Sequence, residues 1–266
     1  MARRRTRRSL ALLPALALTA GCAHSIAPVG EHGELRFVEP GKLTTCTHLP
    51  YEPFQFEQGG RKVGFDVDLV DLVARDLGLQ QKLLDAPFEG IQSGEALNMR
   101  QCDLAAAAMT ITPTRQRNMA FSDPYFDADQ ALLVRAGAPH PDLASLRGKV
   151  LGVQLGTTGE EYARAHQGEF GYRVRQFEDV ALLESSVQNG TIDAGINDNG
   201  VVRSFAKNHP DTRVTAIIPT GEKYGIAVQK QNVPLRQRIN ATLAEAKRSG
   251  EYDRIYRKWI GAPPPK

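Results

Sequence analysis

Several side chains in the middle of the chain are of the types that bind a carboxylate. Arg115 carries a planar guanidinium, which can pair with both oxygens of a carboxylate at once. Thr110 adds a hydroxyl and a backbone N–H nearby. Further along, Gly156-Thr157-Thr158-Gly159 precedes an expected helix, where free N–H groups and the helix dipole favour an anion. The pattern indicates an anion-binding site, although Arg115 taken alone is equally compatible with a solvated loop cation.

Motifs for covalent or metal chemistry are absent from the sequence. It contains no nucleophile elbow and no Cys-x-x-Cys pair, and its six histidines are scattered, with none at a zinc-ligand spacing. We therefore expect no catalytic residue, no metal ion and no cofactor. The chain is expected to be a binding protein and not an enzyme.

Strand-like and helical patterns alternate along the chain and must position these groups. From 66 to 77, apolar residues recur at helical spacing; Asp66 can cap the start of this helix, and Gly78 can end it. An amphipathic helix over 235–259, broken at Gly250, closes the chain. Other strands and helices are expected at 43–47, 81–84, 103–109, 149–154, 160–166, 173–177, 179–189 and 192–196. This alternation predicts two α/β lobes with parallel strands.

The first residues have the features of an export signal. Arginines cluster between Arg3 and Arg8 and precede an apolar stretch over 10–20, which is too short to span a bilayer. We expect cleavage before Cys22 and acylation of this cysteine, although Thr19 replaces the usual aliphatic residue and cleavage after Ala20 is the alternative. Removing residues 1–21 changes the formal charge from +3 to −2, so no nucleic-acid partner is expected.

Two further cysteines, Cys46 and Cys102, lie in strand-like contexts. In an oxidising compartment such a pair usually forms a disulfide, and the bridge is feasible if the two strands are neighbours in one sheet. The alternative is two buried free thiols.

Four ordered stretches carry a resemblance to a known family. The chain resembles the polar-amino-acid class of bacterial extracellular solute-binding proteins, the binding proteins that serve ABC importers. This resemblance extends from about Leu43 to Trp259. The stretches that carry it are Pro50-Tyr51-Glu52-Pro53-Phe54-Gln55-Phe56, Gly64-Phe65-Asp66-Val67-Asp68-Leu69, Met109 to Arg117 running on to Phe121-Ser122-Asp123-Pro124-Tyr125-Phe126, and Gly250 to Trp259.

The resemblance implies an α/β, two-lobed periplasmic-binding-protein-like fold of type II. Each lobe has a mostly parallel sheet flanked by helices, and a two-strand hinge joins the lobes. We expect the first lobe at 42–130 and 225–260, the second at 135–219, and the hinge at 131–134 and 220–224. Residues 1–21 would be the signal peptide, 22–41 a lipid-anchored tether, and 261–266 a tail.

The same resemblance implies roles for the residues that match the family's ligand contacts. Thr110, Arg115 and Thr158 would bind the carboxylate of a free amino acid. Asp198 and the backbone carbonyl of Ala108 would accept hydrogen bonds from its ammonium. Asp198 can equally cap the helix that follows it.

Two aromatic residues and three polar ones complete the expected site. Tyr51 and Phe88 match the pair that sandwiches the ligand, with core packing as the alternative. His48, Glu52 and Gln154 match or neighbour the positions that select the ligand side chain. His48 with Gln154 suits an amide or acidic side chain, whereas Glu52 would suit a basic one or face solvent. We rank a neutral polar or acidic ligand ahead of a basic one.

The expected function is capture of a small polar amino acid and its delivery to an ABC importer permease in the membrane. The chain would act as a monomer at the outer face of the cell membrane, held by a lipid on Cys22, or in the periplasm. The rival functions are an exported dehydratase of the cyclohexadienyl type on the same fold, with His48 or Glu52 as general acid or base, and a ligand-sensing module.

Overall fold

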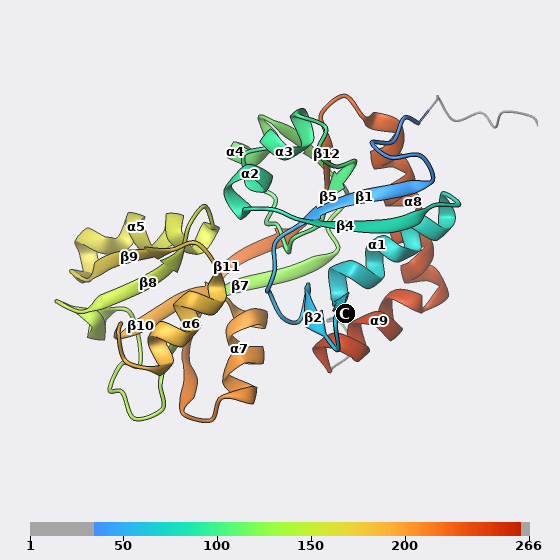
Figure 1. Cartoon of the computed structure of the whole chain (residues 1–266). Helices are drawn as coiled ribbons and strands as arrows, with labels where there is room; N and C mark the ends of the chain where they lie inside the picture. The colour runs from blue at the N-terminus through green and yellow to red at the C-terminus, as the bar shows by residue number, and fades with distance from the viewer. Residues whose placement is uncertain (1–34, 262–266) are drawn as a thin grey trace, which may run out of the picture. The chain divides into compact units, whose positions relative to one another are not determined.

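A computed structural model describes residues 35–261, which form two five-stranded sheets, each covered by helices (Figure 1). The first lobe is built on a sheet with the strand order β4-β1-β5-β12-β6. Strand β1 is parallel to β4 and β5, whereas β12 is antiparallel to β5 and β6. The strands are β1 (Lys42–Thr47), β4 (Gln80–Asp85), β5 (Leu104–Ala105), β6 (Met119–Phe121) and β12 (Ala227–Gln229).

Helices of the first lobe bury apolar side chains against this sheet. One apolar cluster lies under α1, α8 and α9, and a second lies under α2 and α3. The helices are α1 (Phe65–Asp76), α2 (Phe88–Gln92), α3 (Glu95–Asn98), α4 (Pro113–Gln116), α8 (Val233–Ser249) and α9 (Glu251–Ile260), and a small hairpin is formed by β2 (Phe56–Gln58) and β3 (Arg61–Val63). The helix breaks at Gly250, as predicted, because this residue takes the left-handed conformation that glycine adopts at low cost.

The second lobe has the strand order β11-β7-β10-β8-β9. Strands β8, β9 and β10 are parallel, and β7 is antiparallel to both β10 and β11. Its elements are β7 (Phe126–Arg135), the short 3-10 helix η1 (Ala144–Leu146), β8 (Val150–Gln154), α5 (Thr158–Phe170), β9 (Arg173–Phe177), α6 (Val180–Gln188), β10 (Ala194–Asp198), α7 (Asn199–Asn208) and β11 (Thr212–Tyr224). The expected fold of two α/β lobes is confirmed.

The chain passes between the lobes at the start of β7 and the end of β11. The backbone N–H of Tyr125 donates to the carbonyl of Tyr224 at 3.0 Å, and β7 and β11 stay paired from there into the second sheet. Residues 131–134, expected in the hinge, instead pair on both sides inside that sheet, because their continuous apolar sequence suits a buried strand. The linking strands therefore lie nearer the first lobe, at about 126–128 and 222–224.

The two cysteines of the first lobe form a disulfide. Cys46 lies on β1, Cys102 lies two residues before the start of β5, and the two strands are neighbours in the sheet. Their Cα atoms are 5.6 Å apart and the sulfurs are bonded. The expected pairing is present, and it joins two segments that are 56 residues apart in sequence.

The loop after β1 is held against α1 by an aromatic cluster. Phe54 lies at its centre, with ring centroids 4.9 Å from Phe126 and 5.2 Å from Tyr224. Gly64 permits this approach, because a Cβ on it would lie 2.0 Å from the carbonyl oxygen of Phe54. The loop that carries Tyr51 is thereby fixed relative to the sheet.

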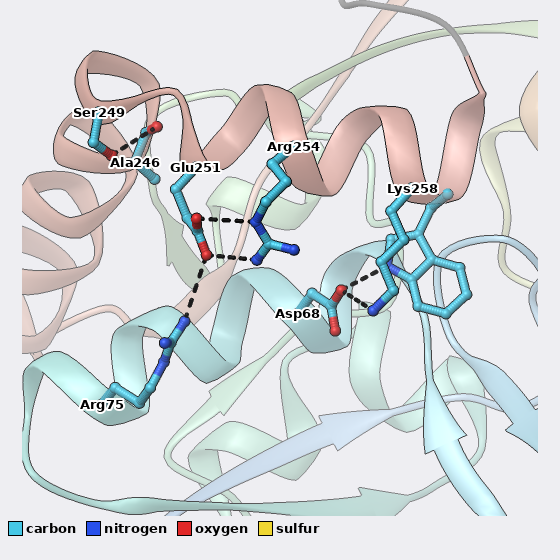
Figure 2. A network of polar contacts seen from close by, with 8 residues as sticks. Asp68, Arg75, Ala246, Ser249, Glu251, Arg254 and Lys258 are labelled. Carbon is cyan, nitrogen blue, oxygen red and sulfur yellow. Dashed lines mark hydrogen bonds and ion pairs between the residues drawn. The ribbon is translucent and has the colours of Figure 1, made fainter.

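The last helix, α9, is attached to α1 by polar contacts (Figure 2). Asp68 on α1 accepts hydrogen bonds from Lys258 Nζ and Trp259 Nε1, both at 2.7 Å. About two helical turns away, Glu251 accepts a hydrogen bond from Arg254 at 2.6 Å and lies 3.8 Å from Arg75 of α1. These contacts join the C-terminal helix to the first lobe.

The segment expected as a tether is partly packed. Leu35 and Phe37 contact the core of the first lobe, and the backbone N–H of Val38 donates to Asp103 at 2.7 Å. The predicted tether 22–41 is therefore too long at its C-terminal end, since apolar residues 35 and 37 are partly buried. The expected signal peptide and Cys22 lie outside the described residues.

Candidate functional site

A small cavity is enclosed by residues of both lobes. About 10 Å³ of space remains in it, enough for about one water molecule. A larger molecule therefore enters only when the surrounding groups move apart. The cavity is lined by His48, Tyr51, Gln55, Phe88, Ala107, Ala108, Thr110, Arg115, Gln154, Thr157, Thr158 and Asp198. Nine of the ten residues predicted to contact a ligand are in this set, and the tenth, Glu52, is not.

Arg115 is the buried cation of the site. Thr112 caps the short helix α4 by accepting a hydrogen bond from the Arg115 backbone N–H at 3.2 Å. The guanidinium donates to the carbonyls of Thr110 at 2.8 Å and of Gly156, in the other lobe, at 3.0 Å. It also lies 5.4 Å from the ring centroid of Phe88. Burial lowers the pKa of Arg115, but a guanidinium stays protonated at any physiological pH.

The two predicted threonines meet at one carboxylate oxygen. Oε2 of Glu222 accepts hydrogen bonds from the hydroxyls of Thr110 at 2.6 Å and Thr158 at 2.7 Å, which belong to different lobes. Thr158 is the first residue of α5, and Thr157 caps that helix by accepting from the Glu160 backbone N–H at 3.1 Å. Helix dipole and hydroxyl groups therefore make this end of the cavity suitable for a carboxylate.

Asp198 is a buried acceptor at the end of β10. Its carboxylate accepts from the hydroxyls of Tyr51, at 2.9 Å, and Tyr224, and from Gln130 Nε2 at 2.6 Å. Although Asp198 precedes α7, its side chain makes no capping hydrogen bond, so the capping alternative is wrong. Burial and the nearby Glu222 charge raise the pKa of Asp198 to about 6, against the hydrogen bonds that lower it.

Asp66 positions the backbone next to the cavity instead of capping α1. Helix α1 begins after Gly64, and no side chain caps it. One oxygen of the buried Asp66 carboxylate accepts from the Ala108 backbone N–H at 2.7 Å and from the Tyr125 hydroxyl at 2.8 Å. The strand expected at 103–109 is paired only at Leu104 and Ala105, and Ala108 has φ 48°, a left-handed conformation that does not suit a strand. Burial raises the pKa of Asp66 to about 7.

His48 and Gln55 bring unpartnered acceptor atoms to the cavity lining. Nδ1 of His48 lies 3.0 Å from the Ala86 carbonyl, which can only accept, so Nδ1 carries the proton. In the neutral ring Nε2 is then an acceptor, and it is buried without a partner among the described residues. Oε1 of Gln55 is likewise buried and unpartnered within residues 35–261. Oε1 of Gln154, by contrast, accepts from Asn197 at 3.2 Å.

Glu52 lies outside the cavity, which corrects its predicted role. Its carboxylate accepts a hydrogen bond from Ser204 Oγ at 3.0 Å and lines a separate cavity. Tyr51 forms an isolated bridge with Gln55, and successive side chains of extended backbone point to opposite sides. With Tyr51 directed into the site, Glu52 is directed away from it.

Comparison with known proteins identifies the family. The model of the bacterial extracellular solute-binding proteins, family 3, matches residues 43–262. The chain belongs to this family. It is 30% identical to a probable histidine-binding protein of Neisseria gonorrhoeae over 92% of this chain and 93% of that one. It is 36% identical to the ABC transporter glutamine-binding protein GlnH of Bacillus subtilis over 77% and 75% of the two chains.

Solved structures with the same fold include arginine-binding proteins. An ancestral arginine-binding protein bound to arginine has a TM-score of 0.78 at 37% identity, covering 82% of this chain and 98% of that one. A mutant of ArgBP from T. maritima has a TM-score of 0.79 at 35% identity, covering 84% and 96%. These relatives are named as amino-acid-binding proteins, and the family that contains this chain is described as one of solute-binding proteins.

Several residues of this solute-binding protein were not predicted as part of the site. Gln55 and Ala107 line the cavity, while Gln130, Asn197 and Glu222 hold its lining groups. A partial signal exists for Gln130, a fully buried amide at the start of the apolar run 131–134. Nothing in the sequence distinguishes Glu222, because its partners Thr110 and Thr158 are remote from it along the chain.

Across residues 35–261, no group of three or more histidine, cysteine, aspartate or glutamate side chains is arranged to hold a metal ion. In the same part of the chain, no helix is long and apolar enough to cross a membrane.

Proposed function

We propose that this protein captures a free polar amino acid outside the cell and delivers it to an ABC importer. The observation that carries the proposal is that donors and acceptors line one buried cavity: Arg115 and Thr158 can bind a carboxylate, and Asp198 can accept from an ammonium. An α-amino acid brings a carboxylate and an ammonium to such a site together. The aromatic rings of Tyr51 and Phe88 line the same cavity.

Binding would exchange internal hydrogen bonds for charge-assisted ones. Arg115 now donates to two neutral carbonyls, and a ligand carboxylate would replace them with a bidentate ion pair. The hydroxyls of Thr110 and Thr158 would turn from Glu222 to the same carboxylate. Because Arg115 and Thr110 lie in the first lobe and Thr158 in the second, the ligand would favour the closed arrangement of the lobes.

The unpartnered acceptors favour a ligand whose side chain ends in N–H donors. Oε1 of Gln55 can accept but cannot donate to a carboxylate, and the same holds for Nε2 of His48 when Nδ1 carries the only ring proton. Glutamine, arginine and histidine therefore fit better than glutamate. An acidic ligand, ranked beside neutral ones from the sequence, thus becomes less favoured. Relatives named for histidine, arginine and glutamine binding support this choice. Between an amide and a guanidinium, the absence of Glu52 from the cavity favours the amide.

Calorimetric titration of the purified protein with glutamine, arginine, histidine and glutamate tests this proposal. We expect glutamine or arginine to bind at least tenfold more tightly than glutamate. Arg115→Ala should weaken that binding by at least a hundredfold, because a buried charged partner costs about 2–5 kcal/mol to remove. Arg117→Ala removes an exposed arginine just after α4 and should leave the affinity unchanged. Equal effects of the two variants, or no binding of any amino acid, would refute the assignment.

Export, lipid attachment and delivery are tested separately in cells. Mass spectrometry of the mature N-terminus should find a diacylated or triacylated Cys22, and Cys22→Ala should release the protein from the membrane fraction. Deleting the gene should reduce uptake of the labelled amino acid that binds in vitro. A mature N-terminus at Gly21, or unchanged uptake, would contradict the respective part of the proposal.

A further inference from the structure

A second cavity lies between the two lobes on the other side of the Tyr51 loop. Its volume is about 560 Å³, within the range of small-molecule sites. One wall is formed by loop residues of the first lobe, including Glu52, and the other by α6 and α7 of the second lobe. None of its lining residues lines the first cavity.

The charged groups around this second cavity are nearly all acidic. Glu52, Glu57, Asp85 and Glu184 line it, and the described lining includes no lysine or arginine. His209 is the one lining residue of the described chain that can become cationic, and its Nδ1 lies 2.9 Å from the Phe205 carbonyl. In a concave site with low-dielectric walls, acids of one sign raise the local concentration of cations.

Glu184, in the middle of α6, is the group that distinguishes this cavity from a merely acidic surface. Its side chain is buried, with 6% of the residue exposed, and Oε1 has no hydrogen-bond partner in the described structure. A buried carboxylate is costly unless it is paired or protonated. Burial, followed by the charges of Glu52 and Asp179, raises the pKa of Glu184 to about 8. Because Glu184 lines the cavity, a cation there would favour the ionised form of its carboxyl group.

The remaining walls are apolar. Phe56, Val180, Val201 and Phe205 line the same space. No three or more metal-ligating side chains are grouped there or elsewhere in 35–261, so an organic cation suits the site better than a metal ion. Ammonium or guanidinium would meet the two glutamates, and an apolar body would contact the aromatic and aliphatic walls.

We propose that this cavity is a second binding site, for a small organic amine or guanidine with an apolar body, whose cation pairs with Glu184 and Glu52. Because both lobes line it, its occupant favours the arrangement of the lobes that also encloses the first cavity. If the first cavity binds an amino acid as proposed above, each ligand raises the affinity for the other by the same factor.

The test uses 2-phenylethylamine as the probe, with 2-phenylethanol as a neutral control of similar shape. In two-dimensional amide NMR spectra, we expect the amine to shift resonances of α6 and α7, and the alcohol to bind at least tenfold more weakly. Glu184→Gln should weaken amine binding at least tenfold, and Glu52→Gln should also weaken it. Glu178→Gln neutralises an exposed acid that does not line the cavity and should change nothing.

The outcomes separate this site from the first one. Amine binding that survives Arg115→Ala, and amino-acid binding that survives Glu184→Gln, would support two distinct sites. Equal binding of amine and alcohol, equal effects of Glu184→Gln and Glu178→Gln, or shifts confined to the first cavity would overturn the proposal. Loss of amino-acid binding alone would refute only the proposed function and the coupling.

Discussion

The hydroxyl of Tyr51 in the first lobe donates a 2.9 Å hydrogen bond to the carboxylate of Asp198 in the second. The Tyr51 hydroxyl also lies 2.5 Å from Oδ1 of Asn197. This Oδ1 accepts a second hydrogen bond from the Asp198 backbone N–H. A single phenol thus connects the lobes at the acceptor end of the cavity. Removing it takes one donor from each of two buried acceptors, both of which keep another donor, and creates no large void.

We expect Tyr51→Phe to lower the free energy of unfolding by about 1 kcal/mol and to weaken amino-acid binding about tenfold, because Asp198 and Asn197 each lose one of their hydrogen bonds in a buried site. Tyr172→Phe is the matched control: its buried hydroxyl donates to the Ala163 carbonyl at 2.7 Å, away from the cavity. It should lower stability similarly in urea unfolding and leave the affinity unchanged. An unaltered affinity in Tyr51→Phe would contradict the role given to this hydroxyl.

The raised pKa of Asp198 predicts a pH-dependent affinity. A ligand ammonium pairs with the ionised carboxylate, so affinity should be constant above about pH 7 and fall below pH 6, by at most tenfold per unit. Binding near pH 6 should release a proton, which titrations in buffers of different ionisation enthalpy would detect. Asp198→Asn should bind weakly with no such dependence. A wild-type affinity that is flat from pH 5 to 8 would rule out Asp198 as the titrating group.

Stability should show the opposite trend with pH. Asp198 takes up a proton at about pH 6 when folded and near 3.8 when unfolded, so the folded chain holds more protons between these values. The free energy of unfolding therefore falls as pH rises through this window, and Asp66 and Glu184 extend the fall to about pH 8. Glu184→Gln should flatten the upper part of the profile and stabilise the protein above pH 7 by on the order of 2 kcal/mol. Urea unfolding at several pH values measures this directly.

The disulfide should contribute stability without being needed for binding. Cys46 and Cys102 are 56 residues apart, and the bridge closes a loop in the unfolded chain. In the chain-entropy model, the lost entropy raises the free energy of the unfolded state by about 4 kcal/mol. We expect Cys46→Ala/Cys102→Ala to unfold at a lower urea concentration, with a free energy of unfolding lower by about 2–4 kcal/mol. The double variant should retain its amino-acid affinity, since neither residue lines the cavity. A lost affinity in a folded double variant would show that the bridge also positions the site.

The attachment of α9 to α1 offers a prediction far from the cavity (Figure 2). Asp68→Ala removes the common acceptor of Lys258 and Trp259 and should cost about 1–2 kcal/mol of stability. Glu245→Ala, which breaks an exposed pair with Arg248 on α8, should cost less than about 0.5 kcal/mol. Hydrogen exchange should show faster exchange of the α9 backbone amides in Asp68→Ala but not in Glu245→Ala.

The residues that line the cavity were largely predictable, because motifs of the family bring them together in sequence. Thr110 and Arg115 share one stretch, and Thr157 and Thr158 begin one helix. Glu52 was misplaced since neighbouring residues of an extended loop point to opposite sides, and the sequence does not tell which side faces the cavity. Residues 131–134 were wrongly assigned to the hinge, because their apolar sequence is compatible with a connector and with a buried strand.

The sequence by itself determined the alternation of strands and helices, the family, and most of the groups able to bind a zwitterion. Those features depend on local periodicity and short motifs. Only the tertiary structure decided that Glu222 joins Thr110 to Thr158, that Tyr51 reaches Asp198, and that Glu184 is left unpaired beside a second cavity. Each of these contacts joins residues remote along the chain, and burial, which sets their energies, exists only in the folded protein.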